Sequence, residues 1–207
     1  QSVSLPEGLK RLGDNVFAYC SALQSIGIPS TVESISDEAF RGCHELRAVT
    51  ISEGVSCIGY AAFASCDGIT SIMIPSTVKE IGYSAFNGCA NLSTAILSEG
   101  VESILDRAFY GCTQLSPINL PQSVVCIGEE VFTGCSWIGD GVVIRDNCVL
   151  SVKGRTSITL PEGVRVIAGG AFSWSAITSV VLPSSIVYIG NAAFKGCFAL
   201  SSIIIPD

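Results

Sequence analysis

Phenylalanine recurs at a constant interval along this chain, and that period limits what the chain can fold into. Six phenylalanines stand 23 residues apart from Phe17 to Phe132, and Phe172 and Phe194 continue the series 22 residues apart. Only Phe198 is out of register. A unit of this length is too short to enclose a hydrophobic core alone. The repeats are therefore expected to stack on one another and to share a core.

Other positions repeat in phase with the phenylalanine. Alanine usually precedes it, cysteine usually follows three residues later, and aliphatic residues precede it, so that one unit reads approximately L-x-x-I-x-I-P-x-x-V-x-x-I-G-x-x-A-F-x-G-C-x-x. The alternating, β-branched I-x-I-P segment predicts a short strand that ends at proline. The V-x-x-I-G segment predicts a weaker second strand, and A-F-x-G-C predicts a tight turn or a single helical turn. We therefore predict a solenoid of eight or nine coils, mostly parallel β-strand with turns and at most short helical turns.

One interval departs from the period. After Phe132 the next phenylalanine is Phe172, so this interval is 40 residues long instead of 23. The extra residues predict an irregular short coil at about 138–160. Its apolar runs, 142–144 and 148–152, flank an Asp-Asn pair. The runs form either a hairpin with Asp-Asn as its turn, or the first and second strands of a coil that lacks the phenylalanine turn. The second arrangement is preferred, and the solenoid is expected to continue in both cases.

Composition argues against two classes of protein. Hydrophobic residues make up 48% of the 207 residues and the mean hydropathy is +0.54. However, Ser, Gly, Pro and Glu interrupt the apolar runs, and none approaches the roughly 18 residues of a membrane-spanning helix. The net charge of −7 is spread along the chain without a basic block, so that phosphate groups would be repelled. We therefore expect no transmembrane segment and no nucleic-acid partner.

The repeats carry a family likeness. The segments IPSTVESISDEAFRGCHEL, IPSTVKEIGYSAFNGCANL and LPSSIVYIGNAAFKGCFAL resemble the leucine-rich repeats of BspA-like bacterial cell-surface proteins. The resemblance covers essentially the whole chain, and NCVLSVKG leading into ITLPEGV is similar to a short coil of that family. Ser175 in place of cysteine and Leu105 and Ala168 in place of glycine are local departures. The resemblance implies a right-handed, secreted or surface-displayed leucine-rich-repeat solenoid for adhesion or recognition, without enzyme activity and without a cofactor.

Both ends of the chain fall in the same phase of the repeat. The chain starts near Leu5 and Pro6 and stops at Ile205, Pro206 and Asp207, and neither end resembles a polar capping repeat. Solenoid ends expose a core face unless such a repeat covers them. Residues 1–207 are therefore expected to form a single solenoid that is a segment of a longer protein, and to be monomeric.

The outer face of the predicted I-x-I strands is the candidate partner-binding face. Because side chains alternate along a strand, the residue between the two buried positions points outward. These residues are Thr50, Met73, Ile96, Asn119 and Val181, with Gly27 and Ile204 completing the row. The row is uncharged and partly apolar, which is typical of an interaction surface. The same composition is equally expected where neighbouring coils must stack closely on one another.

Two tryptophans, Trp137 and Trp174, flank the irregular coil. They form either an aromatic anchor for a partner or packing over the irregularity, and packing is the favoured interpretation.

Ten cysteines suggest disulfide bonds or a metal site, but their spacing favours neither. Seven recur at one phase of the repeat and are predicted to form a ladder of free, buried thiols. They are Cys20, Cys43, Cys66, Cys89, Cys112, Cys135 and Cys197. No C-x-x-C pair is present, so zinc-ligand spacing is missing and no metal site is expected. Cys57 and Cys126 are candidates for exposed thiols, and neither they nor Cys148 are assigned a redox role.

Few residues could support catalysis. His44 is the only histidine and stands at a turn position occupied elsewhere by Ser, Asp, Ala and Thr, which indicates a solvated side chain. The acidic pairs 37–38 and 129–130 also lie in turns, whereas acid–base catalysis needs opposed carboxyl groups in a cleft. No catalytic residue is assigned.

The function predicted from these observations is a non-catalytic recognition or adhesion module. It is expected to lie outside the cell or on its surface and to bind an extracellular protein or glycan through the extended solenoid face. The alternative is a structural spacer that displays another domain and binds nothing. An enzyme is the third and least favoured class.

Overall fold

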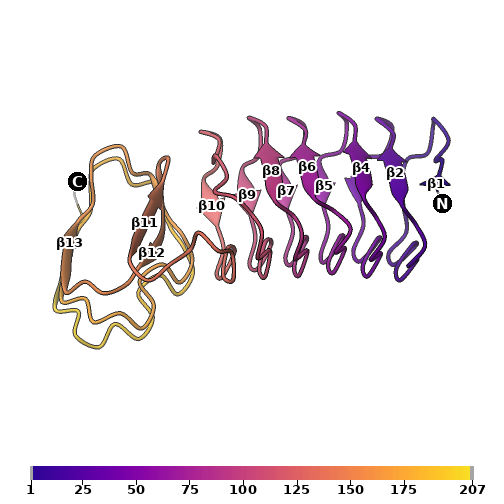
Figure 1. The fold of residues 1–207 in the computed structure, drawn as a ribbon. Helices are drawn as coiled ribbons and strands as arrows, with labels where there is room; N and C mark the ends of the chain where they lie inside the picture. Colours follow the sequence, from indigo (N-terminus) through magenta and orange to yellow (C-terminus); the bar gives the residue numbers. More distant parts are fainter. Residues whose placement is uncertain (1, 206–207) are drawn as a thin grey trace.

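Each repeat unit forms one turn of a parallel β-solenoid in the computed structural model, which describes residues 2–205 (Figure 1). The solenoid has about nine turns, and its described residues form strands and turns without any helix. The predicted fold class and number of coils are thereby confirmed. Pro206 and Asp207, which entered the argument about the chain ends, lie outside the described residues.

The I-x-I-P segments form the first strand of most coils. These strands are β1 (Ser2–Val3), β2 (Ser25–Ile28), β4 (Ala48–Ile51), β6 (Ser71–Ile74), β8 (Thr94–Leu97), β13 (Ser157–Thr159), β15 (Ser179–Val181) and β17 (Ser202–Ile204). They pair in parallel in three groups, β1-β2-β4, β6-β8 and β13-β15-β17. Within each pair the register is the repeat itself, since Ile26 lies opposite Val49 and Ile72 opposite Ala95.

The V-x-x-I-G segments form a second row of shorter strands. These are β3 (Ser34–Ile35), β5 (Cys57–Ile58), β7 (Glu80–Ile81), β9 (Ser103–Ile104), β10 (Cys126–Ile127), β14 (Val166–Ile167) and β16 (Tyr188–Ile189). The first five form one parallel sheet, and β14 pairs with β16 in another. The weaker second strand expected from the sequence is therefore present on the other side of the coil.

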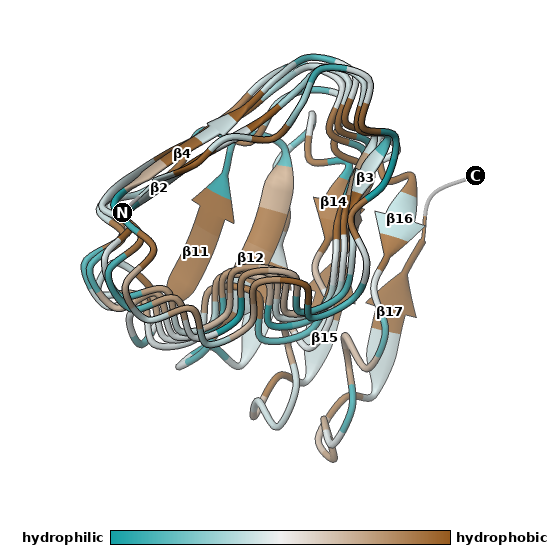
Figure 2. Cartoon of the chain, turned by 90° about the vertical axis from the view of Figure 1, so that its right-hand side faces the viewer, coloured by the Kyte–Doolittle hydropathy of each residue, from teal (hydrophilic) through white to brown (hydrophobic). Residues whose placement is uncertain are grey.

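The phenylalanines stack along the inside of the solenoid. From Phe17 to Phe132, successive ring centroids lie 5.2 to 5.8 Å apart with nearly parallel planes. The aliphatic residues of both strand rows surround this stack and are buried. Figure 2, which looks along the N-terminal coils, shows that their outlines superpose. The shared core therefore extends from coil to coil, as the repeat length requires.

The A-F-x-G-C segment is a turn that hydrogen-bonds to the same turn of the next coil. The backbone amide of Phe40 donates to the carbonyl of Ala62 over 2.8 Å, and the amide of Gly42 donates to that of Ala64 over 2.8 Å. Glycine is favoured at the fourth position of the segment because the backbone there has a positive φ, 69° at Gly42.

The irregular segment is a hairpin, and the preferred interpretation of it is wrong. Strand β11 (Val142–Arg145) pairs antiparallel with β12 (Cys148–Val152). Strand β12 also pairs in parallel with β14, so it takes the second-strand position as expected, but β11 does not take the first. The connection explains why. Residues 29–33 carry the chain from β2 to β3 around the corner of a coil, whereas only two residues join β11 to β12, and Asp146 closes this turn with φ 50°.

The solenoid axis bends at this hairpin. In Figure 1 the N-terminal coils are seen edge-on and the C-terminal coils face-on, and Figure 2 shows the reverse. The stack of phenylalanine rings is also divided, because Phe132 packs on Trp137 and Phe172 packs on Phe194. Like side chains therefore lie along two axes, in place of the single axis that a regular repeat would produce.

Candidate interaction surface

Three of the predicted outward residues lie together on neighbouring strands. Thr50 on β4, Met73 on β6 and Ile96 on β8 are all exposed, with Met73 61% and Ile96 50% exposed. Met73 lies directly opposite Ile96 in the parallel register, and β4 lies beside β6. The N-terminal stack therefore presents an uncharged face with two large apolar side chains in contact range of each other.

The other two members of the row lie apart from this group. Asn119 is exposed, but residues 116–120 form no strand. Pro117 explains the loss, because proline has no amide to donate to a ladder. Val181 is half-buried on β15, opposite Ile204 of β17, on the C-terminal side of the bend. The outward row predicted from the sequence is therefore divided, because a proline and the hairpin interrupt it.

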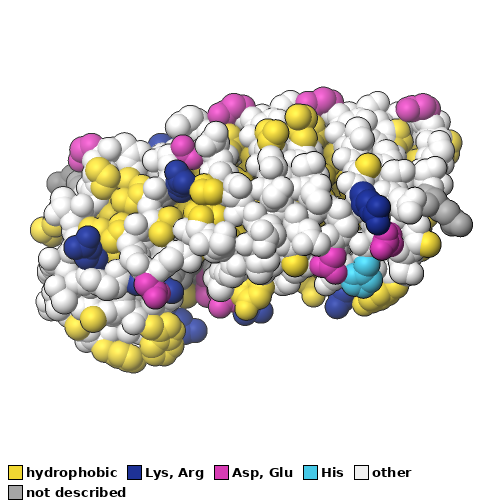
Figure 3. Space-filling view, in the orientation of Figure 1, with side chains coloured by type: hydrophobic (Ala, Val, Ile, Leu, Met, Phe, Trp, Pro, Cys, Tyr) yellow, Lys and Arg dark blue, Asp and Glu magenta, His cyan; other side chains and the backbone are white. Residues whose placement is uncertain are grey.

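Glutamates at the ends of the first strands bind the next coil. The Glu53 carboxylate accepts hydrogen bonds from the backbone amides of Ser76 (3.3 Å) and Thr77 (3.1 Å). These bonds lower the pKa of Glu53, the amide of Ser76 contributing most. Glu99 accepts corresponding bonds from the amides of Gln122 and Ser123. Figure 3 shows acidic side chains spaced along this edge of the molecule. They join neighbouring coils, and the strand face beside them stays uncharged.

The cysteine ladder consists of free thiols, as predicted, but only its middle is buried. Five thiols are buried, whereas Cys20 is exposed and Cys197 is half-buried at the ends of the solenoid. Each buried thiol donates to the phenylalanine carbonyl of the preceding coil, for example from Cys66 Sγ to Phe40 O over 3.0 Å. Burial raises the pKa of Cys43 to about 11. These thiols are therefore protonated near neutral pH and act as packing groups.

The three cysteines outside the ladder are less accessible than the sequence suggested. Cys57 and Cys126 are half-buried, and Cys148 is buried. Cys57 Sγ lies 3.9 Å from the Glu80 carboxylate, and burial raises the pKa of Cys57. Cys126 Sγ donates to the Tyr188 hydroxyl oxygen over 3.3 Å and so connects coils on the two sides of the hairpin.

The remaining titratable candidates lie in structural contacts. His44 is on the surface, where its Nδ1 lies 3.0 Å from the Asp67 carboxylate of the next coil (Figure 3). The Asp37 carboxylate accepts the backbone amide of Tyr60 over 2.7 Å. Among residues 2–205, no group of three or more His, Cys, Asp or Glu side chains could hold a metal ion.

The two tryptophans have different environments. Trp137 is half-buried, with its ring centroid 5.1 Å from that of Phe132 and 5.9 Å from the Arg145 guanidinium carbon. Its indole N–H is buried and has no hydrogen-bond partner in the described part of the chain. Trp174 is exposed and contacts Phe198 edge-on at 5.9 Å. Trp137 therefore packs over the end of the phenylalanine stack, whereas Trp174 remains available on the surface.

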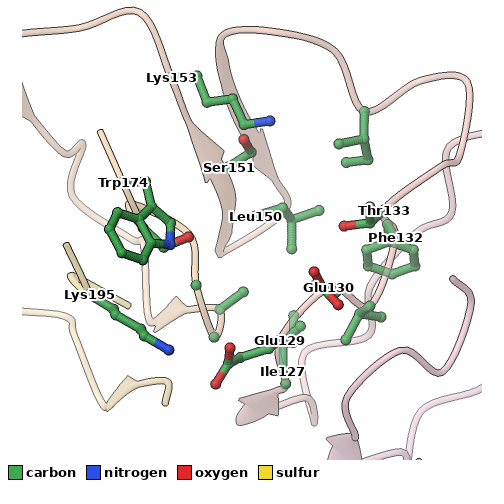
Figure 4. A pocket seen from close by; sticks show the side chains of 17 residues that line it. Ile127, Glu129, Glu130, Phe132, Thr133, Leu150, Ser151, Lys153, Trp174 and Lys195 are labelled. Atoms are coloured by element: carbon green, nitrogen blue, oxygen red, sulfur yellow. The ribbon is translucent and has the colours of Figure 1, made fainter. Parts of the chain in front are cut away.

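A pocket of about 410 Å³ lies at the hairpin (Figure 4). In a regular pair of coils the amide of Phe109 donates to the carbonyl of Val131. At the hairpin, the amide of Val152 donates to the carbonyl of Ala171, the residue before Phe172, over 2.7 Å. Val152 therefore occupies the position that a phenylalanine has in a regular coil. One turn of the stack is thus replaced by an extended strand, which leaves the pocket between Phe132 on one side and residues 168–174 on the other.

The repeat pattern does not predict this pocket. Its lining includes Glu129, Glu130, Ser151, Lys153, Trp174 and Lys195. The one signal in the sequence is the long interval between Phe132 and Phe172, which shows that a turn is altered but not that a space remains.

The family model for the BspA type leucine rich repeat region matches residues 1–138 and 142–207, in six copies. The chain belongs to this family. The match leaves out only residues 139–141, which directly precede β11. The BspA-type resemblance inferred from the repeats is thereby confirmed.

Solved structures of other bacterial leucine-rich repeat proteins share the fold. One from Bacteroides ovatus is 26% identical with a TM-score of 0.68, and the match covers 98% of this chain and 54% of that one. A leucine rich cell surface protein from Faecalibacterium prausnitzii is 27% identical with a TM-score of 0.52, covering 98% and 68%. The T. pallidum leucine rich repeat protein is similar in fold alone, at 23% identity and a TM-score of 0.64, and the match covers 97% of this chain and 78% of that one.

This BspA-type chain thus spans about half the length of the Bacteroides ovatus protein. Among curated proteins, no match was found. Within the described residues, no helix is long and apolar enough to cross a membrane.

Proposed function

We propose that this BspA-type solenoid is a non-catalytic recognition module at the bacterial cell surface, and that it binds an extracellular protein or glycan. The similarity to the leucine rich cell surface protein from Faecalibacterium prausnitzii supports this location. The binding face is the row of Thr50, Met73 and Ile96.

The pair of Met73 and Ile96 is the observation that carries the proposal. Both side chains are at least half exposed although the buried positions of their strands, such as Ile72 and Ile74, already fill the core. Large apolar side chains on the outside of a strand add nothing to that core. An exposed apolar group of this kind, next to hydroxyl-bearing and small residues, is suited to contact with a partner.

Charge reversal at this face tests the proposal. The wild-type chain and the Met73→Glu/Ile96→Glu variant are applied to arrays of purified extracellular proteins and of glycans. Val187→Glu is the matched control, because Val187 is exposed to a similar extent and lies next to β16 on the C-terminal stack. We expect a partner that binds the wild-type chain and the control, and whose affinity falls at least about tenfold with the double variant.

Other outcomes distinguish the remaining functions. A partner that binds all three chains equally would exclude this face as the binding site. The absence of any partner on both arrays would favour a spacer that displays another domain. Substrate turnover that is lost in His44→Ala would favour an enzyme.

A further inference from the structure

Trp174 lies between two adjoining pockets beside the hairpin. The first is the pocket of about 410 Å³ described above, and the second, of about 450 Å³, also includes Lys153, Ser173 and Trp174 in its lining. The two spaces therefore meet at the Trp174 ring. Together they form a cleft that is separate from the outer face of β4, β6 and β8.

The backbone places the Trp174 ring at the rim of this cleft. Trp174 has a φ of 59° at a turn position that most other coils fill with glycine, such as Gly196. A left-handed conformation is costly for a bulky residue. The ring lies close over Gly196, where a Cβ atom would come within 2.5 Å of Trp174 Cε3. Even so, Trp174 remains 68% exposed. The ring is thus held in place by the next coil while much of its surface stays open to a ligand.

The first pocket contains polar groups that lack partners. Ser151 is only 7% exposed, and its hydroxyl makes no hydrogen bond within residues 2–205 but keeps some access to solvent. The backbone amides of Glu130 and Phe132, which in other coils donate to the next turn, also find no acceptor in this part of the chain. A ligand with hydroxyl groups would supply both the acceptors for the amides and a partner for Ser151.

The charges around the first pocket compensate each other. Its lining carries two carboxylates, Glu129 and Glu130, and two ammonium groups, Lys153 and Lys195. Glu130 is paired with Arg107 over 2.6 Å. Figure 4 shows Glu129 and Lys195 on the same side of the pocket, below Trp174. The site thus offers hydrogen-bond donors and acceptors without a net charge, which disfavours phosphorylated and sulfated ligands.

We propose that this cleft binds a neutral oligosaccharide. One sugar ring would enter the first pocket and hydrogen-bond to Ser151, Glu129 and the free amides. The C–H groups of a sugar ring would pack on the Trp174 indole, whose face carries partial negative charge. The second pocket would take the adjoining sugar. This site is independent of the Met73 and Ile96 face, and each can fail without the other.

An array of neutral oligosaccharides tests this site. The array contains glucose, galactose, mannose, N-acetylglucosamine and N-acetylgalactosamine units, and the best binder is then titrated against each chain by isothermal titration calorimetry. We expect Trp174→Ala to weaken binding at least about tenfold, and Ser151→Ala to weaken it several-fold.

Tyr19→Ala is the matched control. Tyr19 has the same φ of 59° at the same turn position, is 63% exposed, and lies over Gly42 as Trp174 lies over Gly196. It is not part of the cleft, so its removal should leave sugar binding unchanged. Met73→Glu/Ile96→Glu should also leave it unchanged. Equal thermal unfolding midpoints for the variants show that each is folded.

Three results would overturn the proposal. The first is no binding of any neutral oligosaccharide on the array. The second is binding that Tyr19→Ala weakens as much as Trp174→Ala does. The third is binding of short peptides from a random tetrapeptide array, dependent on Trp174, when sugars do not bind; the free backbone groups would then recognise a peptide.

Discussion

The backbone amide of Gly169 donates a hydrogen bond of 2.8 Å to the carbonyl of Ile127, although the whole hairpin lies between them in the sequence. Gly128 donates to Ile104 in the same way within the regular coils. The second-strand side of the solenoid therefore stays in contact across the insertion. The turn side is separated by β12, and the pocket and the bend follow from this one-sided insertion.

The hairpin turn should contribute to this junction. The Asp146 carboxylate accepts the backbone amide of Leu120 over 2.7 Å, where Pro117 has removed the regular strand. We expect Asp146→Ala to lower the free energy of unfolding by about 1–3 kcal/mol, measured by urea denaturation. Asp146→Asn keeps an acceptor oxygen and tolerates the positive φ, and should have a smaller effect. Equal stability of the alanine variant and the wild-type chain would show that this bond is unimportant.

The phenylalanine stack should dominate the stability of the N-terminal coils. Phe86 is fully buried between Phe63 and Phe109. We expect Phe86→Ala to cost about 3–5 kcal/mol, seen as a lower urea midpoint. Tyr83→Ala, an exposed aromatic residue in the same coil, should cost much less. A near-neutral Phe86→Ala would contradict the internal position of the stack.

Two glycines at the same phase of the repeat should respond differently to alanine. Both have positive φ, 118° at Gly54 and 91° at Gly163. A Cβ at Gly54 would lie 2.1 Å from the Ser30 carbonyl oxygen, whereas nothing lies within 4 Å at Gly163. We expect Gly163→Ala to cost about 1–2 kcal/mol from the backbone alone, and Gly54→Ala to cost at least about 1–3 kcal/mol more. Urea midpoints measure both, and equal losses would refute the close approach of coils at Gly54.

The buried thiols should make the fold sensitive to alkaline pH. Burial raises the pKa of Cys43 to about 11 and that of Cys135 to about 12, against an ordinary value of 9.0. Their contribution to stability is complete below about pH 9. Above it, the unfolded chain loses protons that the folded chain keeps, so the free energy of unfolding falls until the folded thiols also ionise.

Cysteine variants isolate this effect. Between pH 9 and 11, the unfolding free energy of Cys43→Ala should fall less steeply than that of the wild-type chain, by about 1.4 kcal/mol per pH unit at most. Identical slopes for Cys43→Ala and the wild-type chain would show that the Cys43 thiol ionises equally in both states.

The regular coils were predictable from the repeat because each position has the same neighbours in every unit. The period placed Phe86 inside and Met73 outside, and both are found there. Asn119 is exposed as the pattern predicts, but the neighbouring Pro117 keeps its segment from forming a strand. The prediction that the ladder thiols are buried is wrong for Cys20 and Cys197. Each of them lacks a covering coil on one side among the described residues.

The sequence by itself determined the solenoid, its two strand rows and its shared core, because a short repeated unit can bury its apolar residues only by stacking. The tertiary structure alone decided the bend, the cleft and the exposure of Trp174. These depend on how β12 pairs with β11 on one side and β14 on the other. No position in the repeat encodes that choice, because it results from contacts between segments that have no counterpart in the other coils.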